Sequence, residues 1–223
     1  MFNSFTGSFG FGRRLIGGLT LLLDAGSYSG SGTTWSDRSG RGNDATLVNT
    51  PTYSSSSGGY FSFSPASSEY ATLAGTPLNP TAYTKSVWCM FNATADNNLV
   101  SSSAGGHFMF TGGTSKLYCG HSNWTGFPTT YPSTANVSNG VWYNFALSFS
   151  TTVGMALYIN GTLDSTYTTQ KTAPGGGSVN LAGYSAGGNL LNGKIAKVMI
   201  HNRVLSAREV LQNYNMDKSR FGL

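Results

Sequence analysis

The sequence predicts an all-β domain in which short strands are joined by many turns, and three observations support this. Only 9% of the 223 residues are charged, against roughly 25% in an ordinary globular domain. Glycine contributes 30 residues and aromatic residues 13%, which favours strands and tight turns. Helical bundles and coiled coils are excluded because they need long runs of Ala, Glu, Lys and Leu. The hydrophobic content of 39% is enough for one domain with a sizeable core.

Strand-like runs follow one another at short spacing, separated by clusters of Gly, Ser, Asn and Pro, as in a sandwich or barrel. The strands expected are residues 19–23, 60–63, 70–73, 85–91, 98–102, 107–110, 116–119, 141–149, 155–159, 161–165, 178–182 and 195–200. In residues 141–149 apolar side chains alternate, which predicts a half-buried antiparallel strand. Asn160 and Gly161 separate two runs and predict a type I′ hairpin turn.

A single short helix is predicted near the C-terminus. Ser206 is a candidate N-cap, and Glu209 follows at the spacing of a capping box. Leu205 and Val210 occupy the positions of a hydrophobic staple. We expect the helix to end near Tyr214.

Residues 1–18 are predicted to form an extended arm that precedes a domain of residues 19–223. The arm holds four phenylalanines among small residues without a helical period: Phe2, Phe5, Phe9 and Phe11. We expect these rings to be buried against another surface, and a disordered or locally tucked terminus is the alternative. Arg13 and Arg14 with the following apolar stretch imitate a signal peptide, but that stretch is short and runs into Asp24. No segment approaches the roughly 18 apolar residues of a membrane span.

The net charge of +5 is unevenly distributed. From residue 194 onward, six basic residues face only Glu209 and Asp217. Those basic residues are Lys194, Lys197, Arg203, Arg208, Lys218 and Arg220. This pattern predicts a local basic face rather than the stripe typical of nucleic-acid-binding proteins, so we expect no nucleic-acid partner.

Several segments together resemble a known family. They are WSDRSGRGNDATLVNTPTY, KSVWCMF, VWYNFALSFS, ALYINGTL and NGKIAKVMIHNRVLSAREVLQNYN. Across residues 19–223 the chain resembles the laminin-G-like or pentraxin-like branch of the concanavalin A-like lectin and glucanase superfamily. The resemblance implies a jelly roll of two packed antiparallel sheets with one short C-terminal helix.

A narrower resemblance rests on the segments LLLDAGSYSGSGTTWSDRSG and EVLQNYNMDKSRFGL. They are similar to laminin-G-like modules of tailed-bacteriophage virion proteins. This implies a virion structural protein, in capsid decoration or the tail, that is assembled in the bacterial cytoplasm and anchored partly by the arm. Its expected partners are other virion proteins and further copies of itself, with no membrane insertion. Arg13, Arg14, Arg208, Lys218 and Arg220 would face an acidic partner.

We expect no enzymatic activity and no cofactor. A glycosidase of this superfamily needs at least two carboxylates across one groove, and the only glutamates, Glu69 and Glu209, stand alone and at a helix start. Residues 183–187 fit G-x-S-x-G and residues 188–194 nearly fit a phosphate loop, but both precede an expected strand. The histidines His107, His121 and His201 are scattered and give no zinc spacing.

Two local features leave alternatives open. Asp37, Asn43 and Asp44 could ligate calcium, but Arg38 and Arg41 lie among them, which favours an Asx-type turn. Cys89 and Cys119 lie in apolar stretches, which favours two buried thiols over a single bridge.

The best candidate for ligand binding is the segment GHSNWTGFPTTYPST. It pairs flat apolar rings with hydrogen-bonding groups, as sugar recognition requires, through His121, Asn123, Trp124, Phe127 and Tyr131. A carbohydrate-binding adhesin for a host surface polysaccharide is therefore the alternative function. The competing interpretation is that these rings cap the sandwich or pack against a neighbouring subunit. A secreted bacterial module is less favoured, because neither a convincing signal peptide nor a flanking domain is present.

Overall fold

The computed structural model describes residues 17–73, 75–92, 97–102, 107–113, 115–121, 131–175, 179–183 and 188–223. The predicted docking residues of the arm, Phe2, Phe5, Phe9, Phe11, Arg13 and Arg14, lie outside this part of the chain. Most of the expected domain of residues 19–223 is described.

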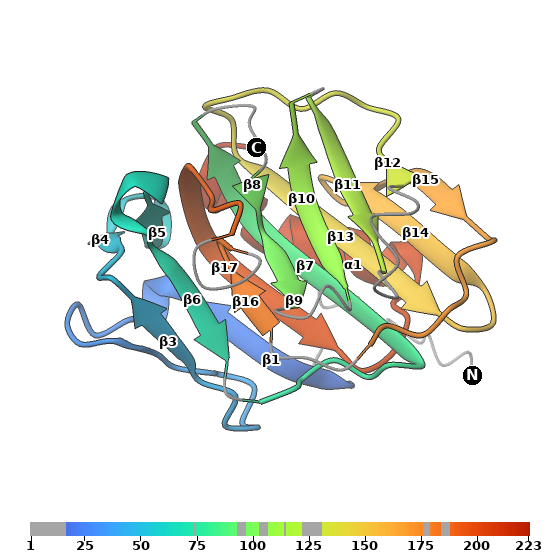
Figure 1. Ribbon diagram of the computed structural model, residues 1–223, viewed down its shortest axis with the longest axis horizontal. Helices are drawn as coiled ribbons and strands as arrows, with labels where there is room; N and C mark the ends of the chain where they lie inside the picture. The colour runs from blue at the N-terminus through green and yellow to red at the C-terminus, as the bar shows by residue number, and fades with distance from the viewer. Residues whose placement is uncertain are drawn as a thin grey trace, which may run out of the picture.

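Two layers of antiparallel sheet pack face to face (Figure 1). The rear layer is one eight-stranded sheet in the order β15-β14-β13-β7-β17-β5-β4, with β1 also paired to β17. Its strands are β1 (Leu19–Asp24), β4 (Thr52–Ser54), β5 (Tyr60–Phe63), β7 (Ala82–Phe91), β13 (Tyr143–Ser150), β14 (Gly154–Ile159), β15 (Thr162–Tyr167) and β17 (Gly193–His201). The predicted all-β sandwich of antiparallel sheets is confirmed.

The front layer consists of two smaller sheets. The five-stranded sheet contains β2 (Thr34–Trp35), β3 (Ala45–Val48), β6 (Tyr70–Leu73), β16 (Val179–Leu181) and β9 (Val100–Ser102). The four-stranded sheet contains β12 (Tyr131–Pro132), β11 (Lys116–Gly120), β10 (Phe108–Gly112) and β8 (Asn97–Asn98). Residues 98–102, expected as one strand, are divided between the two sheets.

The hydrophobic core lies between the layers. Trp35, Phe61, Val87, Phe145 and Leu117 are all fully buried in one continuous cluster drawn from every sheet. Cys89 and Cys119 belong to this cluster as free thiols, so the predicted buried thiols are confirmed.

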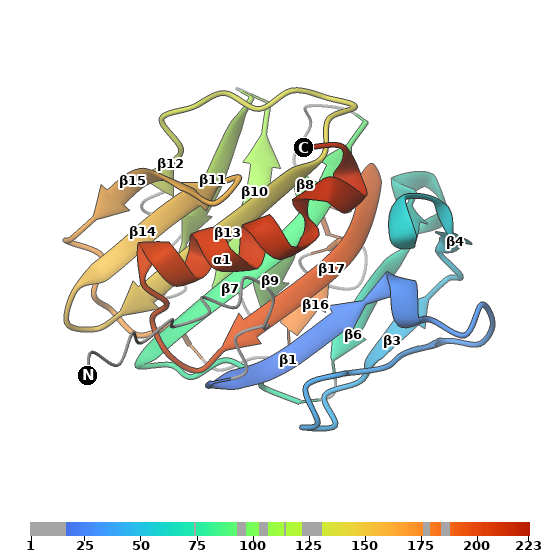
Figure 2. The same ribbon diagram turned by 180° about the vertical axis from the view of Figure 1, so that it is seen from behind.

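The helix α1 (Ala207–Asp217) lies across the strands on the outer face of the eight-stranded sheet and covers part of it (Figure 2). Leu205 and Val210 pack with Ala146 and Tyr158 in one cluster. The prediction that residues 141–149 form a half-buried strand is therefore wrong, because the helix buries the outer face of β13 as well. Alternation alone could not reveal this cover, since Ala146 and its small or polar neighbours resemble solvent-facing residues.

The helix begins as predicted. The side chain of Ser206 accepts a hydrogen bond from the amide of Glu209, and Glu209 accepts one from the amide of Ser206. It ends at Asp217, three residues beyond the expected Tyr214, and continues into the 3₁₀ turn η4 (Lys218–Phe221). Three further 3₁₀ turns are η1 (Ala25–Ser27), η2 (Ser56–Gly58) and η3 (Pro65–Ser67).

The predicted two-residue turn between β14 and β15 is also present. Asn160 and Gly161 have φ angles of 52° and 75°, and positive values at both positions are what a type I′ turn requires. A Cβ on Gly161 would lie 2.9 Å from the Cβ of Tyr214 in α1. Among the described residues, no helix has the length and apolar character needed to cross a membrane.

Candidate functional site

The four-stranded sheet presents an aromatic pair on its outer face. Phe110 lies opposite Tyr118, and Tyr118 lies opposite Pro132. Met109 and Cys119, one position away on the same strands, belong to the core, so alternation along the strands turns Phe110 and Tyr118 outward. Their rings are stacked, with centroids 5.2 Å apart and an interplanar angle of 17°. Both side chains are half-buried.

The segment predicted to bind glycan joins two neighbouring strands of this sheet. It leaves β11, whose Cys119 pairs with Tyr131, and returns in β12. Asn123, Trp124 and Phe127 lie outside the described residues. The topology nevertheless attaches the segment to β11, which bears Tyr118 of the aromatic pair.

His121 and Tyr131, at the two ends of that segment, are buried and bonded within the protein. The Nδ1 of His121 lies 2.8 Å from the carbonyl oxygen of Thr172 and its Nε2 lies 2.7 Å from the hydroxyl of Tyr83. Because a carbonyl only accepts, Nδ1 carries the proton and Nε2 accepts from Tyr83. Burial lowers the pKa of His121 to about 4. The hydroxyl of Tyr131 donates to Oε1 of Gln170 at 2.9 Å.

These two residues are therefore placed as anchors of the segment. The ring nitrogens of His121 and the hydroxyl of Tyr131 form hydrogen bonds within the protein instead of pointing to a ligand. The assignment of the glycan contact to Asn123, Trp124 and Phe127 stays a prediction.

Lys85 of β7 lies fully buried on the inner side of the sandwich, since its neighbours at alternate positions, Tyr83 and Val87, belong to the core. Its Nζ donates to the carbonyl of Val100 at 2.8 Å and lies 3.0 Å from Nδ1 of His107. Burial lowers the pKa of Lys85 to about 7, although the nearby Cys119 opposes this. Burial, and then the Lys85 charge, hold the pKa of His107 well below its usual range. The sequence offered one signal for this cluster, since Lys85 occupies an inward position between Tyr83 and Val87.

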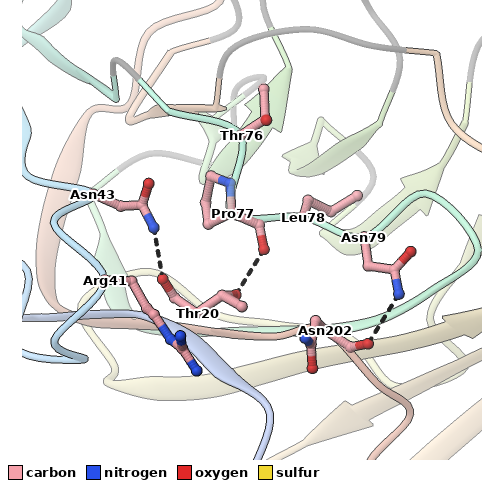
Figure 3. A pocket seen from close by; sticks show the side chains of 8 residues that line it. All are labelled: Thr20, Arg41, Asn43, Thr76, Pro77, Leu78, Asn79 and Asn202. Atoms are coloured by element: carbon pink, nitrogen blue, oxygen red, sulfur yellow. Dashed lines mark hydrogen bonds between the residues drawn. The ribbon is translucent and has the colours of Figure 1, made fainter.

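A polar hollow of about 350 Å³ opens at another edge of the sandwich (Figure 3). Its polar lining comes from four separate segments and consists of Thr20, Arg41, Asn43, Thr76, Asn79 and Asn202. Pro77 and Leu78 supply an apolar wall. The sequence shows no sign of this hollow, because residues so distant along the chain form no local motif.

The turn that contains Asp37 is organised by the protein itself. The carboxylate of Asp37 accepts hydrogen bonds from the amides of Leu22, Ser39 and Asn43 and from the hydroxyl of Ser39. Burial alone would raise the pKa of Asp37, but these hydrogen bonds lower it below the usual value. The hydrogen bond from the amide of Ser39, two residues on, identifies the Asx-type turn that the sequence favours over calcium ligation.

The predicted basic face is wrong for half of its residues. Lys197 is buried and contacts Asp217 and Asp24. Arg203 forms an ion pair with Glu209, and Arg220 forms one with Asp24. These three basic side chains form ion pairs that help to hold α1 and η4 against the sheet. A count of charges along the sequence does not show such pairs.

Both glutamates have structural partners. Glu69 accepts a hydrogen bond from the amide of Ser64 at 2.7 Å. The hydrogen bond from Arg203 lowers the pKa of Glu209 to about 2. Within the described part of the chain, no group of three or more His, Cys, Asp or Glu residues is arranged to hold a metal.

Comparison with protein families gives a match over residues 65–211, about two thirds of the chain, to Laminin_G_3, described as the concanavalin A-like lectin/glucanases superfamily. The chain belongs to this superfamily. The predicted family and jelly-roll fold are thereby confirmed for this concanavalin A-like domain. No curated protein matches the sequence.

Solved structures place the concanavalin A-like domain among proteins of very different sequence. The binding domain of Paraclostridial Mosquitocidal Protein 1 superposes with a TM-score of 0.71 at 14% identity, covering 89% of this chain and 52% of that one. Trypanosoma rangeli sialidase gives 0.66 at 13% identity, covering 91% and 33%.

Domain 4 of the Geobacillus stearothermophilus arabinanase AbnA, in complex with arabinotriose, gives a TM-score of 0.68 at 16% identity, covering 88% of this chain and 98% of that one. The chain thus spans about half or less of the first two proteins and nearly all of the third. At these identities the similarity establishes the fold.

Proposed function

We propose that this protein is a non-enzymatic carbohydrate-binding module. The observation that carries the proposal is the stacked Phe110–Tyr118 pair on the outer face of the four-stranded sheet, where Tyr118 lies on β11, the strand that leads into the Trp124 segment. Aromatic rings offer flat apolar faces to the C–H faces of sugars, and the neighbouring Asn and Thr side chains offer hydrogen bonds to hydroxyl groups. The similarity to an arabinanase domain in complex with arabinotriose supports this function.

The state of the carboxylates supports a binding function rather than hydrolysis. Hydrolysis of a glycoside needs one carboxylic acid and one carboxylate facing the same sugar. Glu69 and Glu209 are bonded to backbone or arginine on different parts of the domain. Asp24 and Asp37 are likewise bonded within the fold.

The test is binding to a glycan array by the wild-type protein and by the Trp124→Ala and Tyr118→Ala variants. We expect each variant to lose about tenfold or more in affinity, which corresponds to about 1.4 kcal/mol. Tyr70→Ala is a matched control, because Tyr70 is a half-buried tyrosine on β6 of the neighbouring sheet. Unchanged melting temperatures would show that the variants fold. Glycan binding that survives both substitutions would contradict the proposal.

We further propose that the module works in a tailed-bacteriophage virion, as a capsid decoration or tail protein assembled in the host cytoplasm. The support is the resemblance of the residues around Asp24 and of the C-terminal segment to virion modules. Arg220 joins these two segments through an ion pair to Asp24 at 2.8 Å. They therefore act as one structural unit. A host polysaccharide is compatible with this role, because a decoration protein can also adhere to cells.

This placement is tested by deleting residues 1–14. We expect the truncated protein to fold with an unchanged melting temperature but to be absent from purified particles, because the arm would supply the docking rings. Incorporation at the wild-type level would exclude the arm as the anchor. The truncated protein is also tested on the glycan array. Glycan binding without incorporation into particles would show that the two proposals are independent of each other.

A further inference from the structure

The polar hollow is built by hydrogen bonds between its walls rather than left by loose packing (Figure 3). The side chain of Asn43 donates to the carbonyl of Thr20 at 2.8 Å, and the hydroxyl of Thr20 donates to the carbonyl of Pro77 at 2.6 Å. On the other side, the amide of Asn79 donates to the carbonyl of Asn202 at 3.1 Å. These contacts hold the connection between β6 and β7 against β1 and the end of β17.

Three lining groups are not used in this framework. The guanidinium of Arg41, the hydroxyl of Thr76 and the side-chain amide of Asn202 make no hydrogen bond to any other described residue. Arg41 and Asn202 lie on opposite sides of the hollow, with Pro77 and Leu78 beyond them (Figure 3). A ligand in the hollow would therefore meet hydrogen-bond donors of Arg41 and Asn202 on two sides and the apolar wall of Pro77 and Leu78 on another.

Among the residues that line the hollow, only Arg41 carries a charge. Among described residues, the ion pairs that involve arginine use Arg203 and Arg220, and none uses Arg41. The carboxylates of the same turn, Asp37 and Asp44, do not line the hollow. Asp37 accepts hydrogen bonds from the amides of Ser39 and Asn43, and Asp44 accepts one from the amide of Asp37. A guanidinium in this setting favours a planar anion that it can bind through two parallel hydrogen bonds.

We propose that the hollow binds the carboxylate-bearing unit of an acidic glycan, as a second subsite separate from the aromatic pair. Arg41 binds the carboxylate, Asn202 and Thr76 bind hydroxyl groups, and the wall of Pro77 and Leu78 contacts a C–H face of the ring. A volume of about 350 Å³ lies within the range of small-molecule sites. This inference rests on the proposed carbohydrate-binding function and adds the class of sugar.

Isothermal titration of the full chain with trigalacturonate and with the uncharged galactotriose tests the inference. We expect the acidic trisaccharide to bind about tenfold or more tightly, and its affinity to fall as salt is added. Arg41→Met removes the charge at similar length and should abolish the preference, whereas Arg41→Lys should retain part of it. Arg38→Met is the matched control, because Arg38 is an exposed arginine of the same turn that does not line the hollow.

Each result decides between the two proposals. Equal binding of both trisaccharides, or a preference that survives Arg41→Met, would overturn the acidic subsite. In that case, sensitivity to Tyr118→Ala would still support carbohydrate binding. If neither these trisaccharides nor any glycan of the array binds, both proposals are contradicted.

Discussion

Two buried lysines in this protein are accommodated in opposite ways. Lys197 of β17 lies beneath the C-terminal segment, with its Nζ 2.5 Å from Asp217 and 3.7 Å from Asp24. Lys85 of β7 lies in the interior between the sheets, bonded to the carbonyl of Val100 and to His107. Both side chains are essentially inaccessible to solvent.

The difference lies in what each environment can supply. The outer face of the sheet is covered by α1 and η4, and α1 contributes the carboxylate of Asp217. The groups described around Lys85 are a carbonyl, two imidazoles, a phenol and a thiol, from Val100, His107, His121, Tyr83 and Cys119. A charged amine is costly there, so the pKa of Lys85 falls to about 7. One lysine is neutralised by partners and the other by losing its proton.

The largest contrast is expected from replacing each lysine with methionine. Lys197→Met leaves Asp217 without its buried partner and should cost about 3–5 kcal/mol in the free energy of unfolding. Lys85→Met leaves one carbonyl and one imidazole nitrogen unbonded but removes a costly amine, so we expect a loss below about 2 kcal/mol. Urea unfolding at pH 8 measures both values. Equal losses would mean that the two sites do not differ in the way described.

The two lysines are also expected to differ in their effect on how stability depends on pH. Between pH 10.5 and about 7 the unfolded chain binds a proton at Lys85 that the folded chain does not bind. Stability therefore rises with pH across this window, by about 3 kcal/mol after allowance for relaxation around the amine. Lys85→Met should flatten the rise in urea-unfolding curves collected between pH 7 and 10, whereas Lys197→Met should leave it in place. An unchanged slope in Lys85→Met would show that Lys85 is charged in the folded protein.

His121 is expected to make the stability of the protein depend on pH in the acid range. Its pKa is lowered by burial from 6.5 to about 4, so the stability that it contributes is present above pH 6.5 and is lost as the pH falls to about 4. His121→Gln keeps an acceptor and a donor but does not titrate, and it should reduce the acid loss by about 2 kcal/mol. Thermal unfolding at pH 7 and pH 4 provides the comparison. An acid loss of the same size in the wild-type protein and in His121→Gln would contradict this role of His121.

The smallest effect is expected from Ser206→Ala, which removes the helix cap and should cost about 1 kcal/mol. Hydrogen exchange should accelerate in α1 but not in β10 and β11, because the helix covers only the face that holds Lys197. Ser27→Ala provides a control serine outside the helix. Faster exchange across both faces would show that the two environments unfold as one unit.

The features predicted correctly from the sequence are those that a few adjacent residues determine. Ser206 and Glu209 determine the start of the helix because both partners of the capping box lie within one turn. Asn160 and Gly161 determine a hairpin because their backbone tolerates positive φ angles. Alternation located most of the long strands, while β2, β3, β4 and β12 were missed because each has at most four residues, several of them polar or exposed.

The features that the sequence did not reveal depend on segments that meet only in the fold. The hollow brings Thr20, Arg41, Asn79 and Asn202 together from four parts of the chain. The pairing of Lys197 and Arg220 with Asp24 joins the first strand to the C-terminal segment. A count of charges therefore predicted a free basic face where the structure has a network of ion pairs.

The position of β17 has a consequence for biosynthesis. This strand pairs with β1, β5 and β7, yet it is the last strand along the described part of the chain. During synthesis, β1 cannot form its pairing with β17 until residues 193–201 have been translated. The large sheet can therefore close only after translation of the domain is almost complete, and its early strands expose unpaired edges to chaperones until then.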